Sequence, residues 1–219
     1  MTLTVPDHIG FCTIQDRIAI LDASRNRYFT LPLALNAAFR RFVGDGDGPA
    51  SADDLQRLLR RGLLADGERT RVLDVPTPTS SYLEDGQIGD TTLSQVLRVG
   101  RRLFAARRAV ERRPFAEVVK QLDQRRARRP AGTAGAATLD LCKAVSQFLA
   151  ARRFVPIAPV CLHDSLALLS YLEPLGFYPT LVFGVALDPF SAHCWVQADG
   201  LVLNDALHRA RSHTPILAL

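Results

Sequence analysis

The sequence feature that most constrains the fold is the stretch VCLHDSLALL at residues 160–169. Two prolines, Pro156 and Pro159, end whatever element precedes it. Apolar residues then recur at helical spacing and Gly176 provides a stop, which predicts a helix that begins near Cys161. Unpaired backbone N–H groups and the positive end of the helix dipole favour a thiolate there. Because the thiolate is the nucleophilic form of cysteine, this helix start is a candidate catalytic site.

A histidine and an aspartate follow Cys161 at spacings that fit one site. His193 lies 32 residues after Cys161, and Asp205 lies 12 residues after His193. A cysteine at a helix start, with His and Asp on neighbouring strands, is the layout of papain-like and transglutaminase-like cysteine enzymes. Three consecutive segments rich in strand-forming residues predict those antiparallel strands: residues 180–187, 193–198 and 201–203.

The turn between the last two strands decides whether Asp205 can reach His193. A two-residue loop would place Asp205 opposite Cys194, on the face away from His193. A three-residue loop at residues 198–200 would place Asp205 opposite His193, and it requires a positive φ at Gly200. We therefore predict the three-residue loop, with one His193 ring nitrogen bonded to Asp205 and the other facing the thiol.

Several segments resemble the peptidase part of the B protein of lasso peptide biosynthesis, a transglutaminase-like leader peptidase. The match runs from about residue 138 to the end of the sequence. It implies Cys161 as nucleophile, His193 as general base and Asp205 as the residue that orients the histidine. The agreeing segments are CLHDSLALL at 161–169, GF at 176–177, LVFGV at 181–185 and PFSAHCWV at 189–196.

The first seventy residues have the pattern of a small domain with three strands and two helices. Ser51 is a good N-cap for the second helix, which runs to Arg61. Together with the closing RGLL at residues 61–64, this order is similar to the PqqD-like recognition element of ribosomally made peptides (RiPPs), a winged-helix domain. The loop at 44–50 departs from that family because it is too short for the usual middle helix. The predicted elements are strands at 9–14, 17–21 and 27–31 and helices at 33–43 and 52–61.

The PqqD-like resemblance implies that the third strand binds a leader peptide. Physically this is β-augmentation, in which an extended peptide pairs with an open strand edge. The candidate peptide-binding residues are Arg27, Tyr28, Phe29 and Thr30. Strand alternation predicts that either Tyr28 or Phe29 belongs to the core instead.

We therefore expect an α+β protein with two domains joined by a linker. Residues 1–70 form the winged-helix PqqD-like domain, and residues 93–219 form the transglutaminase-like (papain-like) cysteine protease domain. Residues 71–92 are polar and proline-rich, which is typical of a linker. In the second domain, further helices are predicted at 93–112, 115–128 and 139–153, with a flexible joint at 130–137.

The net charge of +5 is concentrated in one segment, because residues 98–129 carry 12 Lys and Arg residues and three acidic ones. Such a segment is a solvated helical face, a docking surface for an acidic partner, or a nucleic-acid site. It lies outside the domain expected to recognise a ligand, so we expect no nucleic-acid partner. The longest uncharged run near the catalytic residues, 174–187, is too short to cross a membrane.

Cysteine usage and charge indicate a cytoplasmic protein. The four cysteines, Cys12, Cys142, Cys161 and Cys194, are scattered without CxxC pairs, as in a reduced protein with free thiols. No secretory signal is expected, because acidic residues interrupt the first twenty positions.

Metal binding is the main rival chemistry for the same residues. Cys161, His163, His193 and Cys194 are all possible zinc ligands. Neighbouring His193 and Cys194 on one strand point to opposite faces, however, so we expect no metal site. The sequence also lacks GxxxxGK and GxGxxG motifs, and we expect no cofactor.

These resemblances predict a leader peptidase that binds the leader of a lasso precursor peptide and cleaves it from the core. They imply a second partner, a separate ATP-using, asparagine-synthetase-like cyclase that acts on the freed amine. Two other functions remain open. The same three residues suit a transglutaminase-like acyl transferase, and a winged-helix domain also suits a DNA-binding regulator.

Overall fold

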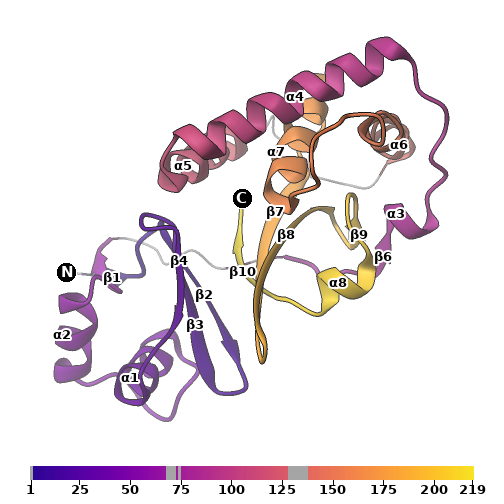
Figure 1. The fold of residues 1–219 in the computed structure, drawn as a ribbon. Helices are drawn as coiled ribbons and strands as arrows, with labels where there is room; N and C mark the ends of the chain where they lie inside the picture. Colours follow the sequence, from indigo (N-terminus) through magenta and orange to yellow (C-terminus); the bar gives the residue numbers. More distant parts are fainter. Residues whose placement is uncertain (1, 68–72, 74, 128–137) are drawn as a thin grey trace. The chain divides into compact units, whose positions relative to one another are not determined.

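The strands and helices of the computed structural model fall into two units, Met1–Leu73 and Asp74–Leu219. The structure describes residues 2–67, 73, 75–127 and 138–219. The flexible joint expected at residues 130–137 lies outside the described residues. Each unit has its own sheet and its own helices (Figure 1).

The first unit is built on an antiparallel sheet with the order β2-β3-β4. Phe39 and Leu58, one from each helix, pack in the same buried cluster as Ile18 and Ile20 of the central strand. The strands and helices predicted for this region are confirmed, with ends within one residue of the predicted ones. The elements are β1 (Leu3–Thr4), β2 (Ile9–Ile14), β3 (Arg17–Asp22), β4 (Arg27–Thr30), α1 (Leu33–Val43), α2 (Ala52–Arg60) and β5 (Ala65–Asp66), where β1 pairs with β5.

Local sequence explains where these elements turn and begin. Gln15 and Asp16 adopt positive φ values of 47° and 63° between β2 and β3, as a tight hairpin requires. Ser51 and Asp54 form a capping box at the start of α2, each side chain accepting the other's backbone N–H at 3.1 Å. Arg41 of α1 binds the same Asp54 carboxylate at 2.7 Å, so the cap also joins the two helices.

The second unit is a five-stranded sheet with the order β10-β7-β8-β9-β6, antiparallel except for the β6–β9 pair. Neighbouring residues of β7 point to opposite faces: Phe183 contacts Phe115 of α5, and Val182 packs near Ala210 of α8. Helix α7 lies between α4 and β8 (Figure 1). The elements are β6 (Ser80–Ser81), α3 (Tyr82–Asp85), α4 (Leu93–Arg112), α5 (Phe115–Ala127), α6 (Leu139–Arg152), α7 (Cys161–Leu172), the 3₁₀ helix η1 (Glu173–Leu175), β7 (Thr180–Leu187), β8 (Phe190–Ala198), β9 (Leu201–Val202), α8 (Leu207–Arg211) and β10 (Thr214–Ala218).

The predicted helices and strands of this unit are present, but the structure adds elements at the start and at the end of the unit that were not expected. The segment 71–92, expected to be a linker, contributes β6 and α3, and Ser80–Ser81 pairs with Leu201–Val202 in the sheet. Thr79 and Ser80 also donate backbone hydrogen bonds to the carbonyl of Gly200, at 2.8 and 3.3 Å. The short helix α8 and the edge strand β10 were not predicted. Much of the polar, proline-rich segment is therefore part of the second unit.

The loop prediction for the β8–β9 hairpin is wrong. Gln197 pairs with Val202 and Ala198 with Leu201, which leaves a two-residue loop. The positive φ falls on Asp199, at 48°, and not on Gly200. Gly200 instead packs closely against Thr79, since a Cβ there would lie 2.6 Å from the Thr79 hydroxyl and that side chain would have to shift.

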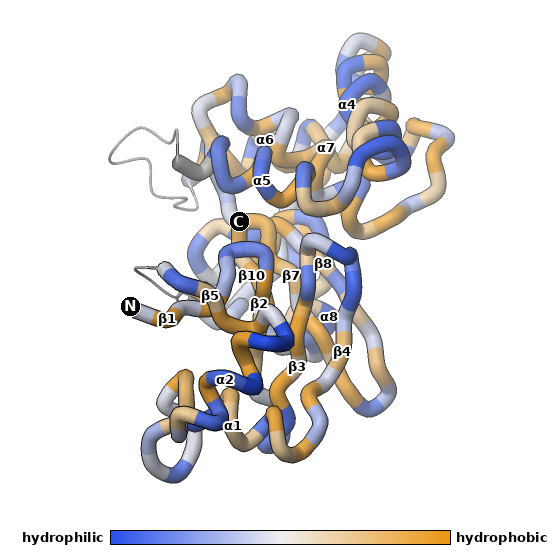
Figure 2. Tube along the Cα trace, turned by 90° about the vertical axis from the view of Figure 1, so that its left-hand side faces the viewer, coloured by the Kyte–Doolittle hydropathy of each residue, from blue (hydrophilic) through white to orange (hydrophobic). Residues whose placement is uncertain are grey.

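The arginine-rich segment forms α4 and α5. Its apolar residues Val99 and Leu103 are fully buried, whereas Arg101, Arg107 and Arg108 are exposed. Figure 2 shows this alternation along α4, in contrast to the mainly hydrophobic β7 and β10. The arginines therefore lie on the outward face of an amphipathic helix, as expected for a solvated or docking face.

Candidate active site

Cys161 is the first residue of α7, and a partly buried ion pair between Arg152 and Asp164 fixes this helix start. The Asp164 carboxylate accepts the Val160 backbone N–H at 3.0 Å, in place of a side-chain cap from Val160 itself. Arg152 of α6 donates to the same carboxylate and to the carbonyls of Val155 and Ile157, at 3.2 and 2.9 Å. The cap and the preceding loop are therefore anchored together.

His193 and Asp205 come together beside the thiol. The His193 Nε2–H donates to Asp205 Oδ2, and the two side chains are only 11% and 12% exposed. The other carboxylate oxygen accepts the Ala206 backbone N–H at 2.8 Å. Since Nε2 is occupied by Asp205, Nδ1 is the ring nitrogen that remains for the hydrogen bond between His193 and Cys161. The expected contacts on both sides of the imidazole are thus present.

The contact between Asp205 and His193 forms although the hairpin register opposes it. The backbone pairing of β8 with β9 ends just after Val202, where the Leu203 N–H makes one more hydrogen bond, to the Val196 carbonyl at 2.8 Å. Beyond Leu203 the Asn204 side chain takes over and accepts the Val196 N–H at 2.8 Å. The backbone bends away there, so strand parity does not determine where Asp205 points.

The surroundings of Cys161 favour the thiolate strongly. A hydrogen bond from the Cys194 thiol, helped by His193 and opposed by burial, lowers the pKa of Cys161 to about 4. Burial alone would lower the pKa of His193, but hydrogen bonds to Asp205 and Cys161 outweigh it and raise that pKa to about 9. Between these values the pair exists as a thiolate beside an imidazolium, which is the reactive form of a cysteine nucleophile.

Comparison with known protein families agrees with this geometry. The model of the transglutaminase-like superfamily matches residues 100–218, more than half of the chain. The chain belongs to the transglutaminase-like superfamily. Members of this superfamily are typically cysteine-dependent enzymes. Comparisons with curated proteins and with solved structures gave no match.

The matched region contains the whole Cys161, His193 and Asp205 arrangement, and the expected mixed α+β fold with a transglutaminase-like domain is confirmed for this part of the chain. Within the described residues, no group of three or more His, Cys, Asp or Glu side chains is placed to hold a metal ion. No helix in the described ranges is long and apolar enough to cross a membrane.

Cys194 belongs to the transglutaminase-like site, and sequence reasoning missed this. It lies on the α7 side of β8, where it is hydrogen-bonded to Cys161 and to Ser165. His193 lies on the other side, with its ring stacked on that of Trp195 at 6.3 Å. The expected opposite orientation is therefore correct, but both side chains reach Cys161 because its sulfur lies at the strand edge. Two features of the sequence could have indicated this contact: Cys194 directly follows His193, and Ser165 lies one helical turn after Cys161.

A second histidine also lies next to His193. His213 Nδ1 donates to the Arg209 carbonyl at 2.9 Å, so its Nε2 accepts from the Ser191 hydroxyl at 2.8 Å. Its ring centroid is 5.4 Å from that of His193. Gly184 makes room for this packing, since a Cβ there would lie 2.9 Å from the His213 Cβ. Gly184 of the LVFGV segment is thus part of the wall beside His193.

The site lies in a cleft of about 520 Å³, large enough for a peptide segment. Arg153 and Pro159 at its rim are exposed, and the Arg209 side chain, 58% exposed, approaches Asp205 Oδ1 at 3.8 Å. The cleft is lined by Phe148, Leu149, Arg152, Arg153, Val155, Ile157, Pro159, Cys161, Asp164, His193, Cys194, Asn204, Asp205 and Arg209.

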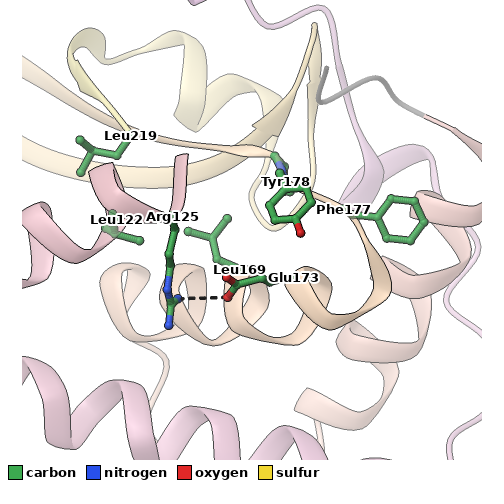
Figure 3. A pocket seen from close by; sticks show the side chains of 8 residues that line it. Leu122, Arg125, Leu169, Glu173, Phe177, Tyr178 and Leu219 are labelled. Atoms are coloured by element: carbon green, nitrogen blue, oxygen red, sulfur yellow. Dashed lines mark ion pairs between the residues drawn. The ribbon is translucent and has the colours of Figure 1, made fainter. Parts of the chain in front are cut away.

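A second, apolar pocket lies between α5, α7 and the end of the chain (Figure 3). Leu122, Leu169 and Leu219 line it, and Arg125 closes one side through an ion pair with Glu173 at 3.6 Å. Its volume of about 30 Å³ accommodates roughly one water molecule, so it does not compete as a substrate site.

The four candidate peptide-binding residues form β4 in the first unit. Arg27 is exposed, and Phe29 packs against the core, as alternation required of one aromatic residue. The Leu31 N–H donates to the Ile18 carbonyl of β3 at 3.2 Å. Because backbone groups alternate in direction along a strand, the Phe29 backbone also points toward β3, whereas the Thr30 backbone points toward the outer edge of β4. Strand β4 is the last strand of its sheet.

Proposed function

We propose that this protein is a leader peptidase of lasso peptide biosynthesis, which binds a precursor's leader and cleaves it from the core. The observation that carries the proposal is the thiolate of Cys161 beside His193 and Asp205 in an open cleft. It is joined by the resemblance of residues 161–169 and 189–196 to the corresponding lasso protein. The superfamily match supports the cysteine chemistry, and the resemblance supports the substrate.

In this proposal the first unit is a PqqD-like domain that captures the leader. The support is the edge strand β4, whose Thr30 backbone points outward, and the helices α1 and α2 behind the sheet. A leader strand adds to this edge by main-chain hydrogen bonds, and side chains at Arg27 and Tyr28 provide specificity. Holding the leader on the same chain raises the effective concentration of the scissile bond near Cys161.

The cleavage follows from the geometry around the thiolate. Cys161 Sγ attacks the scissile carbonyl carbon and forms a tetrahedral intermediate, and the unpaired N–H groups at the start of α7 stabilise its oxyanion. His193 gives its proton to the departing amine of the core peptide, leaving the leader as a thioester on Cys161. Water, deprotonated by His193, then hydrolyses the thioester and releases the leader with a free carboxylate. Asp205 holds the ring in the correct orientation throughout.

The amine released by this cleavage is the substrate of the next enzyme in the proposal. A free α-amine on the core is what a separate asparagine-synthetase-like cyclase joins to an Asp or Glu side chain, using ATP. The transglutaminase-like superfamily also supports a second function, because an amine could replace water and receive the acyl group.

Mass spectrometry of the purified protein incubated with its precursor peptide separates these two functions. Leader peptidase activity gives a free leader with a C-terminal carboxylate and a core with a new N-terminus. Acyl transfer gives a cross-linked product and no free leader acid. A precursor that stays intact at the leader–core junction, in the presence of the cyclase and ATP, would overturn both.

A further inference from the structure

Two sulfur atoms meet at the base of the cleft. Cys161 and Cys194 are free cysteines that both line it, and their side chains are hydrogen-bonded to each other. The Cys194 backbone N–H also bonds Cys161. The geometry of strand β8 explains why the Cys194 N–H points this way. The Val196 backbone groups point toward β9, and in a strand the backbone groups two residues earlier, those of Cys194, point to the same side. Cys194 lies beyond the last residue pair of β8 and β9.

A buried polar network holds Cys194 in this position. Its side chain is hydrogen-bonded to Ser165 of α7, which is fully buried. Asn204 donates to the Ser165 hydroxyl at 3.0 Å and ties the network to β8 through Val196. In the proposed cleavage the Cys194 thiol stabilises the Cys161 thiolate by a hydrogen bond but neither transfers a proton to the substrate nor attacks it, so its sulfur is left for a further reaction with Cys161.

We propose that Cys161 and Cys194 form an oxidant-sensitive modification site, in which a hydroperoxide converts the pair to an intramolecular disulfide that reversibly stops the enzyme. The inference rests on the proposed function, because it takes Cys161 as the nucleophile. The Cys161 thiolate attacks one peroxide oxygen, the O–O bond breaks, and the sulfur becomes a sulfenic acid as hydroxide leaves. The Cys194 sulfur then attacks the Cys161 sulfur, the S–O bond breaks, and water carries away the hydroxyl group and the thiol proton.

The positions of the two cysteines suit these two roles. Cys161 is partly exposed in the cleft, where a small peroxide can reach it, and Cys194 is buried behind it. The hydrogen bond to Cys161 is the largest cause that raises the pKa of Cys194, so the resting thiol keeps its proton. Oxidation of Cys161 to a neutral sulfenic acid removes that thiolate, and Cys194 becomes easier to deprotonate. A dithiol reductant returns both thiols by exchange.

The direct test is intact-mass and peptide-map analysis of the full chain after treatment with hydrogen peroxide and alkylation of remaining thiols. The wild-type protein is expected to lose about 2 Da and to yield a peptide linked through Cys161 and Cys194, and dithiothreitol is expected to reverse both changes. Cys194→Ser keeps a hydrogen-bond donor but cannot close the disulfide. Its Cys161 is expected to gain about 32 Da as sulfinic acid, which dithiothreitol does not remove. Cys142→Ser is the matched control and should behave as wild type.

The readout is the mass of the protein, so it is independent of any peptidase activity. A disulfide without leader cleavage would support the modification site and remove the proposed substrate. Wild-type Cys161 that reaches sulfinic acid as fast as in Cys194→Ser, or that links to Cys142, would overturn the inference. Should Cys194→Ser fail to fold, Cys194→Ala and the wild-type peptide map give the same decision.

Discussion

The Ser81 hydroxyl donates a 2.6 Å hydrogen bond to the backbone carbonyl of Asp205, 124 residues later in the chain. Both residues are buried, and Ser81 also caps α3 by accepting the Leu83 N–H at 3.1 Å. A segment that reads as a linker therefore supports the residue that orients His193. Strand β6 therefore holds the backbone of the residue whose carboxylate accepts a hydrogen bond from His193.

Ser81→Ala should lower both stability and turnover. The variant leaves the Asp205 carbonyl without its buried donor, which costs about 1–3 kcal/mol in the free energy of unfolding. A displaced Asp205 also orients His193 less well, so kcat should fall while leader affinity is retained. Urea unfolding and single-turnover cleavage measure the two effects. Ser80→Ala, one residue earlier, is the control, and equal behaviour of the two variants would exclude this role for Ser81.

Asp205→Asn should reduce cleavage by on the order of 100-fold. An amide does not stabilise the imidazolium, so the pKa of His193, now raised to about 9, should move down. The upper limb of the pH–rate profile should shift to lower pH in the variant. Asp199→Asn, on the exposed hairpin loop, serves as the control. A profile with an unchanged upper limb would mean that another group orients His193.

The pKa values predict different pH dependences for cleavage and for alkylation. Cys161 loses its proton as the pH rises through about 4, so both rates should rise there. His193 loses its proton as the pH rises through about 9, so the leaving amine is no longer protonated and cleavage should fall. Iodoacetamide labelling of Cys161 should persist above that pH, because the thiolate remains. Labelling that begins only near pH 9, as for an ordinary thiol, would contradict the ion pair.

Thr30→Pro should weaken leader binding by about tenfold or more, because it removes the N–H that points to the outer edge of β4. Thr30→Ala keeps that N–H and should bind nearly as wild type. Fluorescence polarisation with a labelled leader peptide gives the affinities, and circular dichroism checks that both variants are folded. Equal affinities for folded Thr30→Pro and Thr30→Ala would place the leader elsewhere.

The sequence predicts most elements of this fold because their signals are local. Alternation and turn residues locate β2, β3 and β7, and Ser51 marks a helix start that the structure confirms. The edge strand β10 and the short helix α8 carry no such signal. They depend on packing against β7 and on Ala210 in the core beside Trp195, which only tertiary structure provides.

For the candidate site too, the sequence predicts what local patterns carry and misses what depends on tertiary structure. The spacing of Cys161, His193 and Asp205 and the family resemblance bring out the three residues that the structure places together. Strand parity gave the wrong loop, because Asp205 lies beyond the end of the ladder and is positioned by side chains. The support from Ser81 and the contact of Cys194 are long-range or depend on the strand edge, and no local pattern predicts them.

The measurement that tests the central claim most directly is leader release by Cys161→Ala, followed by mass spectrometry, with leader affinity measured on the same preparation. The claim that Cys161 is the nucleophile predicts no released leader and nearly unchanged affinity, because the proposal assigns leader binding to the first unit. Cys142→Ala, which lacks a thiol outside the cleft, should cleave at the wild-type rate. Cleavage by Cys161→Ala at the wild-type rate would contradict the claim.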